Sequence, residues 1–341
     1  MMSSFREEAP LKELYKDAFH IGAAVNLKTI ESQRSLLAYH FNSLTAENEM
    51  KFSSVHPQQE VYTFEDADAI ASFAREQGMA LRGHTLVWHN QTPDWLFENE
   101  TGELVERSIL LERLKTHIQT VVGRYKDVIY AWDVVNEVIS DDADDENAFL
   151  RPSKWLDIAG EDFIAKAFEF AHEADPQALL FYNDYNESSP HKRERIFRLV
   201  RSLLDQGVPI HGVGLQAHWN LYDPSLDDMR AAIERYAQLG LQLQLTELDV
   251  SVFRFEDKRT DLVMPSQEML ELQAERYESI FRLLHEYKKH ISAVTFWGAA
   301  DDYTWLDNFP VRGRKNWPFL FDESHRPKEA YQRIAQIVVP K

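Results

Sequence analysis

The feature that most constrains this 341-residue chain is a repeated alternation of short apolar segments with longer segments of helical apolar spacing. The short segments predict β-strands. Several of them are apolar on both sides, which is typical of strands buried on both faces of a sheet. The eight predicted strands are Ile21–Val25, Ser43–Ala46, Ala80–Leu86, Ile129–Val134, Ala178–Asn183, His211–Gln216, Gln242–Thr246 and Ser292–Trp297.

Between the predicted strands, apolar residues recur every three or four positions, and this spacing predicts helices. Clear examples run from Leu111 to Tyr125, from Ile196 to Leu204 and from Met229 to Tyr236. Gly207 and Gly240 follow two of these segments and are expected to end the helices before the next strand.

Eight strand–helix units without a low-complexity linker predict a parallel sheet closed into a single (β/α)8 barrel, a TIM barrel, as one domain over residues 1–341. The alternative is a doubly wound open α/β sheet. That fold normally carries a glycine-rich phosphate-binding turn after its first strand. The corresponding segment here has one glycine, Gly22, so the barrel is favoured.

The charge of the chain limits its partners. There are 56 Asp and Glu residues against 37 Lys and Arg, which gives a formal net charge of −19. Such a surface repels polyanions, so we expect no nucleic-acid partner and no anionic membrane partner. Solubility is a sufficient explanation for the charge. The absence of cysteine excludes disulfides, thiolate metal sites and a cysteine nucleophile.

The beginning of the chain, Met1–Pro10, lacks the basic flank and apolar run of a signal peptide. No apolar stretch is long enough to span a membrane. If residue 1 is the native start, these features predict a cytoplasmic protein.

Polar residues cluster where the predicted strands end, which is where barrel enzymes carry their chemistry. Any one of these residues alone would more often be structural or simply solvated. Seven clusters at predicted strand ends favour a functional interpretation. Carboxylates, amides and imidazoles bind hydroxyl groups and indole rings stack on pyranose rings, so the combination suits a sugar. The clusters are Glu47–Lys51, His84–Asn90, Asn136–Glu137, Asn183–Asn186, Gln216–Trp219, Thr246–Asp249 and Trp297–Gly298.

Three segments, Gly83–His89, Trp132–Glu137 and Thr246–Asp249, resemble in order and spacing the family 10 glycoside hydrolases of the xylanase type. The resemblance extends over residues 19–322. It implies a retaining endo-1,4-β-xylanase that acts on xylan or xylan-derived oligosaccharides without a cofactor or a metal. The stretch Gly298–Phe309 is more similar to the intracellular members of the family.

The resemblance also implies roles for individual residues. Glu137 is similar in position to the acid/base and Glu247 to the nucleophile. Asn183 and Tyr185 fall near the leaving-group side. Asp249 is expected to support His218, which in turn is expected to bind Glu247. The residues similar to those that line the glycone subsites are Glu47, Asn48, Lys51, His84, Trp88, Asn136, Gln216, His218, Trp297 and Trp305.

The mechanism depends on the separation of the two carboxyl groups. A gap of about 5–5.5 Å permits a covalent intermediate with retention of configuration, whereas about 6.5–9.5 Å leaves room for water and inverts it. The resemblance implies that Glu137 and Glu247 lie at the ends of the fourth and seventh strands, and from this placement we expect the short gap between them. Asn136 is expected to donate a hydrogen bond to the sugar 2-hydroxyl.

Three alternatives stay open on the sequence. Another barrel glycosidase with two glutamates would act on β-glucan or β-galactan. A metal-dependent barrel hydrolase commonly needs a His-x-His pair on its first strand, where this chain has only His20. A non-catalytic sugar-binding protein would explain the aromatic and amide side chains but not the two glutamates. The sequence does not determine the oligosaccharide length, the tolerated side groups or the oligomeric state.

Overall fold

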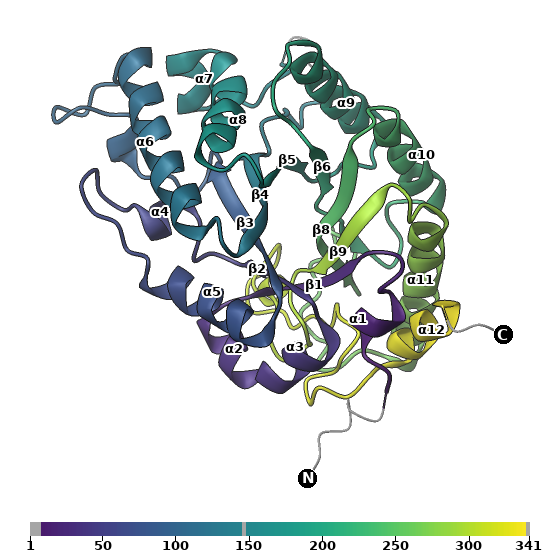
Figure 1. Ribbon diagram of the computed structural model, residues 1–341. Helices are drawn as coiled ribbons and strands as arrows, with labels where there is room; N and C mark the ends of the chain where they lie inside the picture. Colours follow the sequence, from purple (N-terminus) through teal and green to yellow (C-terminus); the bar gives the residue numbers. More distant parts are fainter. Residues whose placement is uncertain (1–7, 145–147, 339–341) are drawn as a thin grey trace.

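A computed structural model describes residues 8–144 and 148–338, and shows a ring of parallel strands inside a ring of helices (Figure 1). All eight predicted strands are confirmed, and β8 extends beyond its predicted end. Residues 1–7, which belong to the segment expected to lack a signal peptide, lie outside the described range. The strands are β1 (His20–Val25), β2 (Ser43–Ala46), β3 (Ala80–Val87), β4 (Ile129–Asn136), β5 (Leu179–Asp184), β6 (Gly212–Leu215), β7 (His218–Asn220), β8 (Gln242–Ser251) and β9 (Ile291–Phe296).

The ring closes through eight parallel strands. Strands β1 to β6 pair in chain order, β1 also pairs with β9, β9 with β8, and β8 with β6. In the closing pairs His20 lies opposite Ala293, and Gly212 lies opposite Gln242. This topology is the predicted (β/α)8 barrel. Because all strands are parallel, their C-terminal ends meet at one rim.

The sixth predicted strand, His211–Gln216, corresponds to β6, and the chain forms a further short strand, β7, directly after it. Between them Ala217 adopts a left-handed backbone conformation with φ of 60°. After this break β7 continues beside the second half of β8, where His218 lies opposite Asp249. The break therefore ends the barrel strand, and β7 carries His218 along the rim.

Helices follow the strands and cover the barrel (Figure 1). The predicted helices correspond to α6, α9 and α10. Gly207 and Gly240, with φ of 73° and 72°, lie just beyond α9 and α10, as expected for glycine after a helix C-terminus. The helices are α1 (Leu11–Leu14), α2 (Leu27–Ser32), α3 (Arg34–His40), α4 (Phe52–Val55), α5 (Glu65–Gln77), α6 (Arg107–Tyr125), α7 (Lys154–Ala159), α8 (Asp162–Ala174), α9 (Pro190–Asp205), α10 (Leu226–Ala237), α11 (Gln267–Glu286) and α12 (Glu329–Val338), with short 3-10 turns η2 (Asp94–Leu96) and η3 (Trp305–Asp307).

Serine side chains fix the start of four outer helices. Ser153, Ser189, Ser225 and Ser266 precede α7, α9, α10 and α11, and each hydroxyl accepts a hydrogen bond from a backbone N–H three residues later. Such caps satisfy N–H groups that have no partner within the helix.

The inside of the barrel holds a buried polar group beneath the rim. The guanidinium of Arg82 on β3 forms two hydrogen bonds with Asp133 on β4, at 3.0 and 2.7 Å, and Nε donates to Gln244 on β8 at 2.6 Å. Asp133 also contacts His84 Nδ1 at 3.0 Å. The pKa of Asp133 is lowered because Arg82 and His84 outweigh the effect of burial. A charged pair inside the barrel thus fixes the position of His84.

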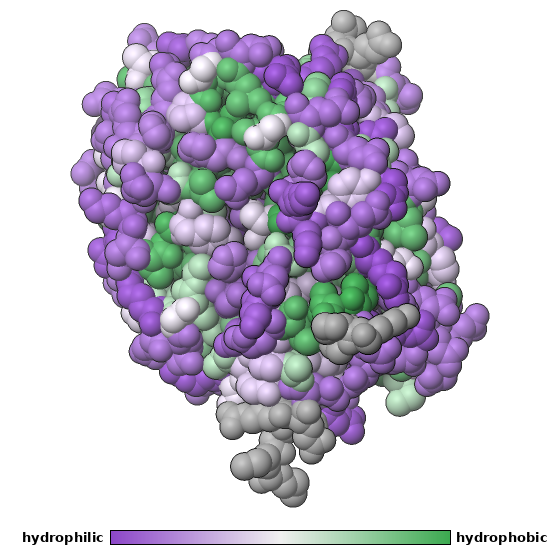
Figure 2. All heavy atoms as spheres, turned by 45° about the vertical axis from the view of Figure 1, so that its right-hand side comes forward, coloured by the Kyte–Doolittle hydropathy of each residue, from purple (hydrophilic) through white to green (hydrophobic). Residues whose placement is uncertain are grey.

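The visible surface is mainly hydrophilic, with apolar side chains in small separate groups (Figure 2). Over the two described ranges, no helix combines the length and the apolar character needed to cross a membrane.

Candidate active site

Glu137 follows the last residue of β4 and is held at every polar atom of its side chain. The indole N–H of Trp88 donates to Oε2 at 2.7 Å, and the amide of Gln216 donates to Oε1 at 2.8 Å. The backbone N–H of Glu137 donates to the carbonyl of Asn183 at 2.9 Å. The residue has φ of 59°, a left-handed conformation that is uncommon outside glycine. Its neighbours thus hold a partly buried carboxyl group in one orientation.

Glu247 lies within β8 and is 5% exposed. Asn183 Nδ2 donates to Oε1 at 2.9 Å, and His218 Nε2 lies 3.0 Å from Oε2. His84 Nδ1 is 3.9 Å from Oε1. Burial alone would raise the pKa of Glu247, but His84 and His218 outweigh it, and the pKa is lowered. Glu247 is therefore an ionised carboxylate at neutral pH.

His218 lies between two carboxylates. Its Nδ1 is 2.9 Å from Asp249 Oδ2, so the predicted contacts with Asp249 and Glu247 are confirmed. Burial lowers the pKa of His218, but Asp249 and Glu247 outweigh this effect and raise it to about 10. The ring is therefore an imidazolium at neutral pH and donates from both nitrogens. Trp305 Nε1 also donates to Asp249 Oδ2, at 2.8 Å.

Three amide side chains, Asn136, Asn183 and Gln216, connect the two glutamates, and we call them the amide bridge. Asn136 Oδ1 accepts from Asn183 Nδ2 at 3.0 Å and from Gln216 Nε2 at 3.2 Å. Asn183 also donates to Glu247, and Gln216 to Glu137. The amide bridge brings Glu137 and Glu247 into one network at the same rim.

The amide nitrogen of Asn136 is a donor group that the described protein does not use. The residue is 1% exposed, and within the described part of the chain its Nδ2 has no hydrogen-bond partner. Buried donors are nearly always satisfied in folded proteins. A ligand hydroxyl would supply the missing acceptor.

On the β2 and β3 side of the rim, Lys51 is the main cation. Its Nζ donates to Asn48 Oδ1 at 2.9 Å and lies 4.8 Å from the ring centre of Trp88. Burial lowers the pKa of Lys51, although Glu247 and Glu47 act in the opposite direction. The predicted residues Glu47, Asn48, Lys51 and Trp88 thus occupy neighbouring positions.

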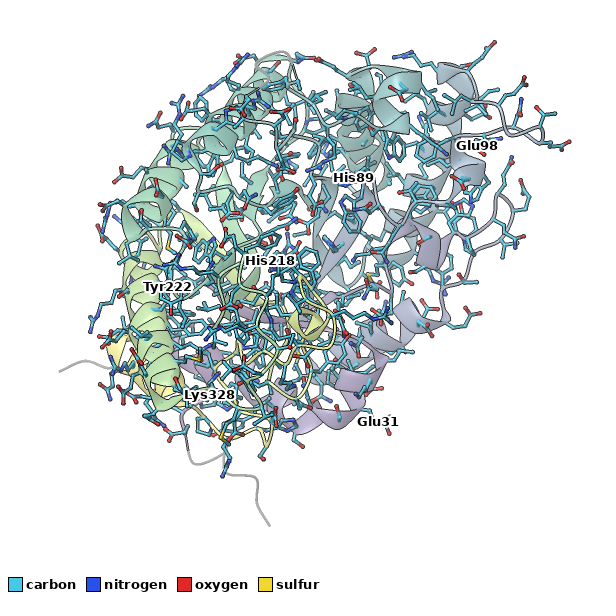
Figure 3. All side chains as sticks on the ribbon, turned by 180° about the vertical axis from the view of Figure 1, so that it is seen from behind. Glu31, His89, Glu98, His218, Tyr222 and Lys328 are labelled. Carbon is cyan, nitrogen blue, oxygen red and sulfur yellow. The ribbon has the colours of Figure 1, made fainter. Side chains whose placement is uncertain are left out.

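Two indole rings follow β9 and lie around His84 and His218. Trp297 makes edge contacts with His84 and His218, with ring centres 5.3 and 6.3 Å apart. The Trp305 ring centre is 4.8 Å from that of His218. Figure 3 shows His218 near the middle of the barrel, beside a segment from the C-terminal part of the chain.

The structure places Asn183 differently from the expectation of a leaving-group contact. Asn183 is 0% exposed. Its Oδ1 accepts from Thr246 at 2.6 Å, and its Nδ2 is shared by Asn136 and Glu247. Its amide is therefore engaged with protein groups, and it supports Glu247. Tyr185 is partly buried, and its hydroxyl contacts Asp141 and Arg151.

Several residues that hold the site were not predicted. Asn26 and Tyr303 each bind Glu47 Oε2 at 2.9 Å, and Arg151 binds the backbone of Glu137. Arg82 lies within a predicted strand, and its side-chain contacts were not predicted. Asn26 directly follows a predicted strand, and this position could have indicated that it belongs to the site. Tyr303 and Arg151 lie in loops and Arg82 lies inside the barrel, so their positions along the chain provided no such indication.

The described residues include no group of three or more His, Asp or Glu side chains that could hold a metal ion. The histidines of the site are instead engaged with carboxylates and indole rings.

A parallel (β/α)8 barrel with two glutamates, amides and indoles at its C-terminal rim has the fold and the site of a glycoside hydrolase. The match to a family model identifies which family of glycoside hydrolases this is. The model of glycosyl hydrolase family 10 matches residues 10–337, and the chain belongs to this family.

Similar proteins agree with this assignment. The chain is 60% identical to endo-1,4-beta-xylanase B of Paenibacillus barcinonensis over 95% of this chain and 97% of that protein. It is 58% identical to an endo-1,4-beta-xylanase of Geobacillus stearothermophilus over 96% and 98% of the two chains. The crystal structure of xylanase XynB from Paenibacillus barcinonensis, complexed with a conduramine derivative, matches with a TM-score of 0.94 and 59% identity over 96% and 98% of the two chains. A mutant structure in complex with xylotriose matches with a TM-score of 0.93 and 51% identity over 96% and 99%.

Proposed function

We propose that this protein is a retaining endo-1,4-β-xylanase that hydrolyses xylan-derived oligosaccharides, with Glu137 as acid/base and Glu247 as nucleophile. The observation that carries the proposal is the pair of glutamates joined by the amide bridge, one beside two histidines and the other held by neutral donors. Family membership and the xylanase relatives support the reaction and the substrate class.

In the first step a carboxylate oxygen of Glu247 attacks the anomeric carbon. The bond between this carbon and the leaving oxygen breaks, and Glu137 transfers its proton to that oxygen. The product is a glycosyl ester on Glu247. His218 and Asn183 hold Glu247 for the attack, while Trp88 holds the acid.

In the second step Glu137, now a carboxylate, takes a proton from water as the water attacks the anomeric carbon. The ester bond breaks, Glu247 becomes a carboxylate again, and the sugar leaves with its original configuration. The unused Nδ2 of Asn136 is the donor for the sugar 2-hydroxyl, a contact that strengthens in the transition state. This mechanism requires the short carboxyl separation of about 5–5.5 Å.

The substrate class follows from the relatives and from the site. The relatives are named endo-1,4-beta-xylanases, and one similar structure is described as a complex with xylotriose. Glu47 and Lys51 provide polar contacts for hydroxyl groups, and Trp297 and Trp305 provide aromatic faces.

The test compares two variants on xylo-oligosaccharides and on aryl xylobiosides. Glu247→Gln should abolish turnover of every substrate because no nucleophile remains. Glu137→Ala should retain kcat/KM on an aryl xylobioside with a good leaving group, lose about 10²- to 10⁴-fold on xylo-oligosaccharides, and regain kcat with azide. The exposed Glu112→Gln is the control and should leave the rates unchanged.

NMR identification of the first product anomer tests whether the configuration is retained. A comparison of the rates on xylo-oligosaccharides and cello-oligosaccharides tests the sugar specificity. Inversion of configuration, full activity of Glu247→Gln, or a preference for cello-oligosaccharides would each contradict the proposal.

A further inference from the structure

The segment between β4 and α7 returns to the end of β4 and contacts it again through Arg151. The Nε of Arg151 donates to the backbone carbonyl of Glu137 at 3.0 Å. The backbone N–H of Arg151 donates to the carbonyl of Val138 at 2.8 Å. A residue 14 positions later in the chain thus fixes the peptide group that directly follows Glu137.

This contact satisfies a carbonyl group that the sheet leaves free. β4 ends at Asn136, and the left-handed conformation of Glu137 turns its peptide away from the direction of the strand. Residues held in sparsely populated backbone regions persist only where their surroundings fix them. Asn183 fixes the N–H side of Glu137 and Arg151 fixes the carbonyl side.

Arg151 is itself held at its other end. Its Nη2 donates to Asp141 Oδ2 at 2.7 Å and to the Tyr185 hydroxyl at 2.8 Å. Lys192 on α9 donates to the other oxygen of Asp141 at 2.6 Å. Burial raises the pKa of Asp141, but Lys192, Tyr185 and Arg151 outweigh it and lower it to about 2. The guanidinium is therefore bound to an ionised carboxylate that α9 fixes in place.

A second contact anchors the same segment without touching Glu137. Arg195 on α9 donates from Nη1 to the carbonyl of Ala148 at 2.7 Å. Arg195 is 5% exposed. Both arginines hold the segment, but of the two only Arg151 contacts Glu137. Substitutions of Arg151 and Arg195 therefore separate the anchoring of the segment from the positioning of Glu137.

We propose that Arg151 is a positioning residue for the proton-transfer step: its bond to the Glu137 carbonyl sets the direction in which the Glu137 carboxyl reaches the leaving oxygen. The inference rests on the proposed acid/base role of Glu137 and adds a residue to it. A displacement of about 1 Å at a reacting group costs about 10²-fold in rate, so a loss of this bond has a measurable effect.

The experiment measures kcat/KM, which reports the first step, on aryl xylobiosides of good and poor leaving groups. Arg151→Gln should lower kcat/KM by about 10- to 100-fold on the poor leaving group and by less than about threefold on the good one, which needs no proton. Arg151→Lys should recover little, because an ammonium cannot reproduce the fork of the guanidinium.

Arg195→Gln is the matched control and should show no dependence on the leaving group, even where thermal unfolding shows the same loss of stability. If Arg151→Gln lowers both rates equally, or if Arg195→Gln reproduces the dependence on the leaving group, the inference is wrong.

If Arg151→Gln does not fold, Asp141→Asn replaces it. This variant retains the guanidinium but removes its carboxylate partner. The same dependence on the leaving group is expected, and its absence overturns the inference. Failure of the proposed function is distinguishable, because Glu137→Ala would then show no leaving-group dependence at all.

Discussion

At the scale of single residues, the two glutamates differ in the charge of the groups that bind them. Glu247 lies beside His84 and the imidazolium of His218, whereas Glu137 receives hydrogen bonds from an indole and an amide, which are neutral. A neighbouring cation favours the ionised carboxylate. Different surroundings thus give two identical side chains different chemical roles, as a retaining mechanism requires.

His218 is, with His84, one of the two histidines that lower the pKa of Glu247. In His218→Gln the amide can still donate to Glu247, but the positive charge is lost and the pKa of Glu247 rises. A carboxylate with a raised pKa takes up its proton earlier as the pH falls. The acid limb of the kcat/KM–pH profile should therefore move to higher pH by about one unit or more.

His20→Gln is the control for this measurement, because His20 is exposed at the N-terminal end of β1, away from the rim. An acid limb that stays in place in His218→Gln would show that the imidazolium does not set the charge of Glu247.

At the scale of elements, small residues in β6 make room for the side chains of β5. A Cβ atom added to Gly214 would lie 2.3 Å from Asn183 Oδ1 and 2.9 Å from Thr246 Cγ2. Asn183 donates a hydrogen bond to Glu247, and the Thr246 hydroxyl donates one to Asn183. The absence of a side chain at Gly214 therefore determines where Asn183 lies.

Gly214→Ala should displace Asn183 and disturb the amide bridge. Overpacking of a buried site typically costs about 1–3 kcal/mol, and we expect a lower melting temperature together with a loss of kcat of at least about tenfold, because Glu247 loses a donor. Gly123→Ala is the matched control, since Gly123 lies in α6 with no atom within 4 Å of the added Cβ. An active and stable Gly214→Ala protein would show that the space around Asn183 can adjust.

The sequence predicts elements better than contacts between them. The strands and their polar ends were predictable because strand burial and the position of the rim follow from local pattern. The role of Arg151 was not predictable. It lies in a loop, and its contact with Glu137 depends on how that loop folds back onto the end of β4. The resemblance places Asn183 near the leaving-group side, and only the packing of β5 between β4 and β6 shows that its amide binds Glu247.

At the scale of the whole molecule, closure of the ring brings the two ends of the described chain together (Figure 1). The first strand pairs with the last, and the hydroxyl of Tyr15 donates to the carbonyl of Ile334 on α12 at 2.7 Å. Tyr331 on the same helix contacts the carbonyl of Ala9. The last helix therefore holds the segment around α1, which precedes the first strand.

Ile334→Ala tests this coupling. Ile334 is 0% exposed, and truncation of a buried isoleucine typically costs about 2–5 kcal/mol. We expect this loss in the free energy of unfolding, measured with a chemical denaturant. The kcat at low temperature should be unchanged, because Ile334 contacts Tyr15, which lies before the N-terminal end of β1 and not at the rim. Leu272→Ala, at a position 36% exposed on α11, should cost much less. Equal losses in the two variants would show that α12 adds little to the closed barrel.

The amide bridge has one further consequence. Primary amides donate and accept hydrogen bonds but do not exchange their protonation state in the working range of an enzyme. A connection made of Asn136, Asn183 and Gln216 can thus pass on a shift in position from one glutamate to the other, yet it offers no route for a proton between them. In the proposed mechanism, the proton that Glu137 transfers therefore has no path through the amide bridge to the ionised Glu247.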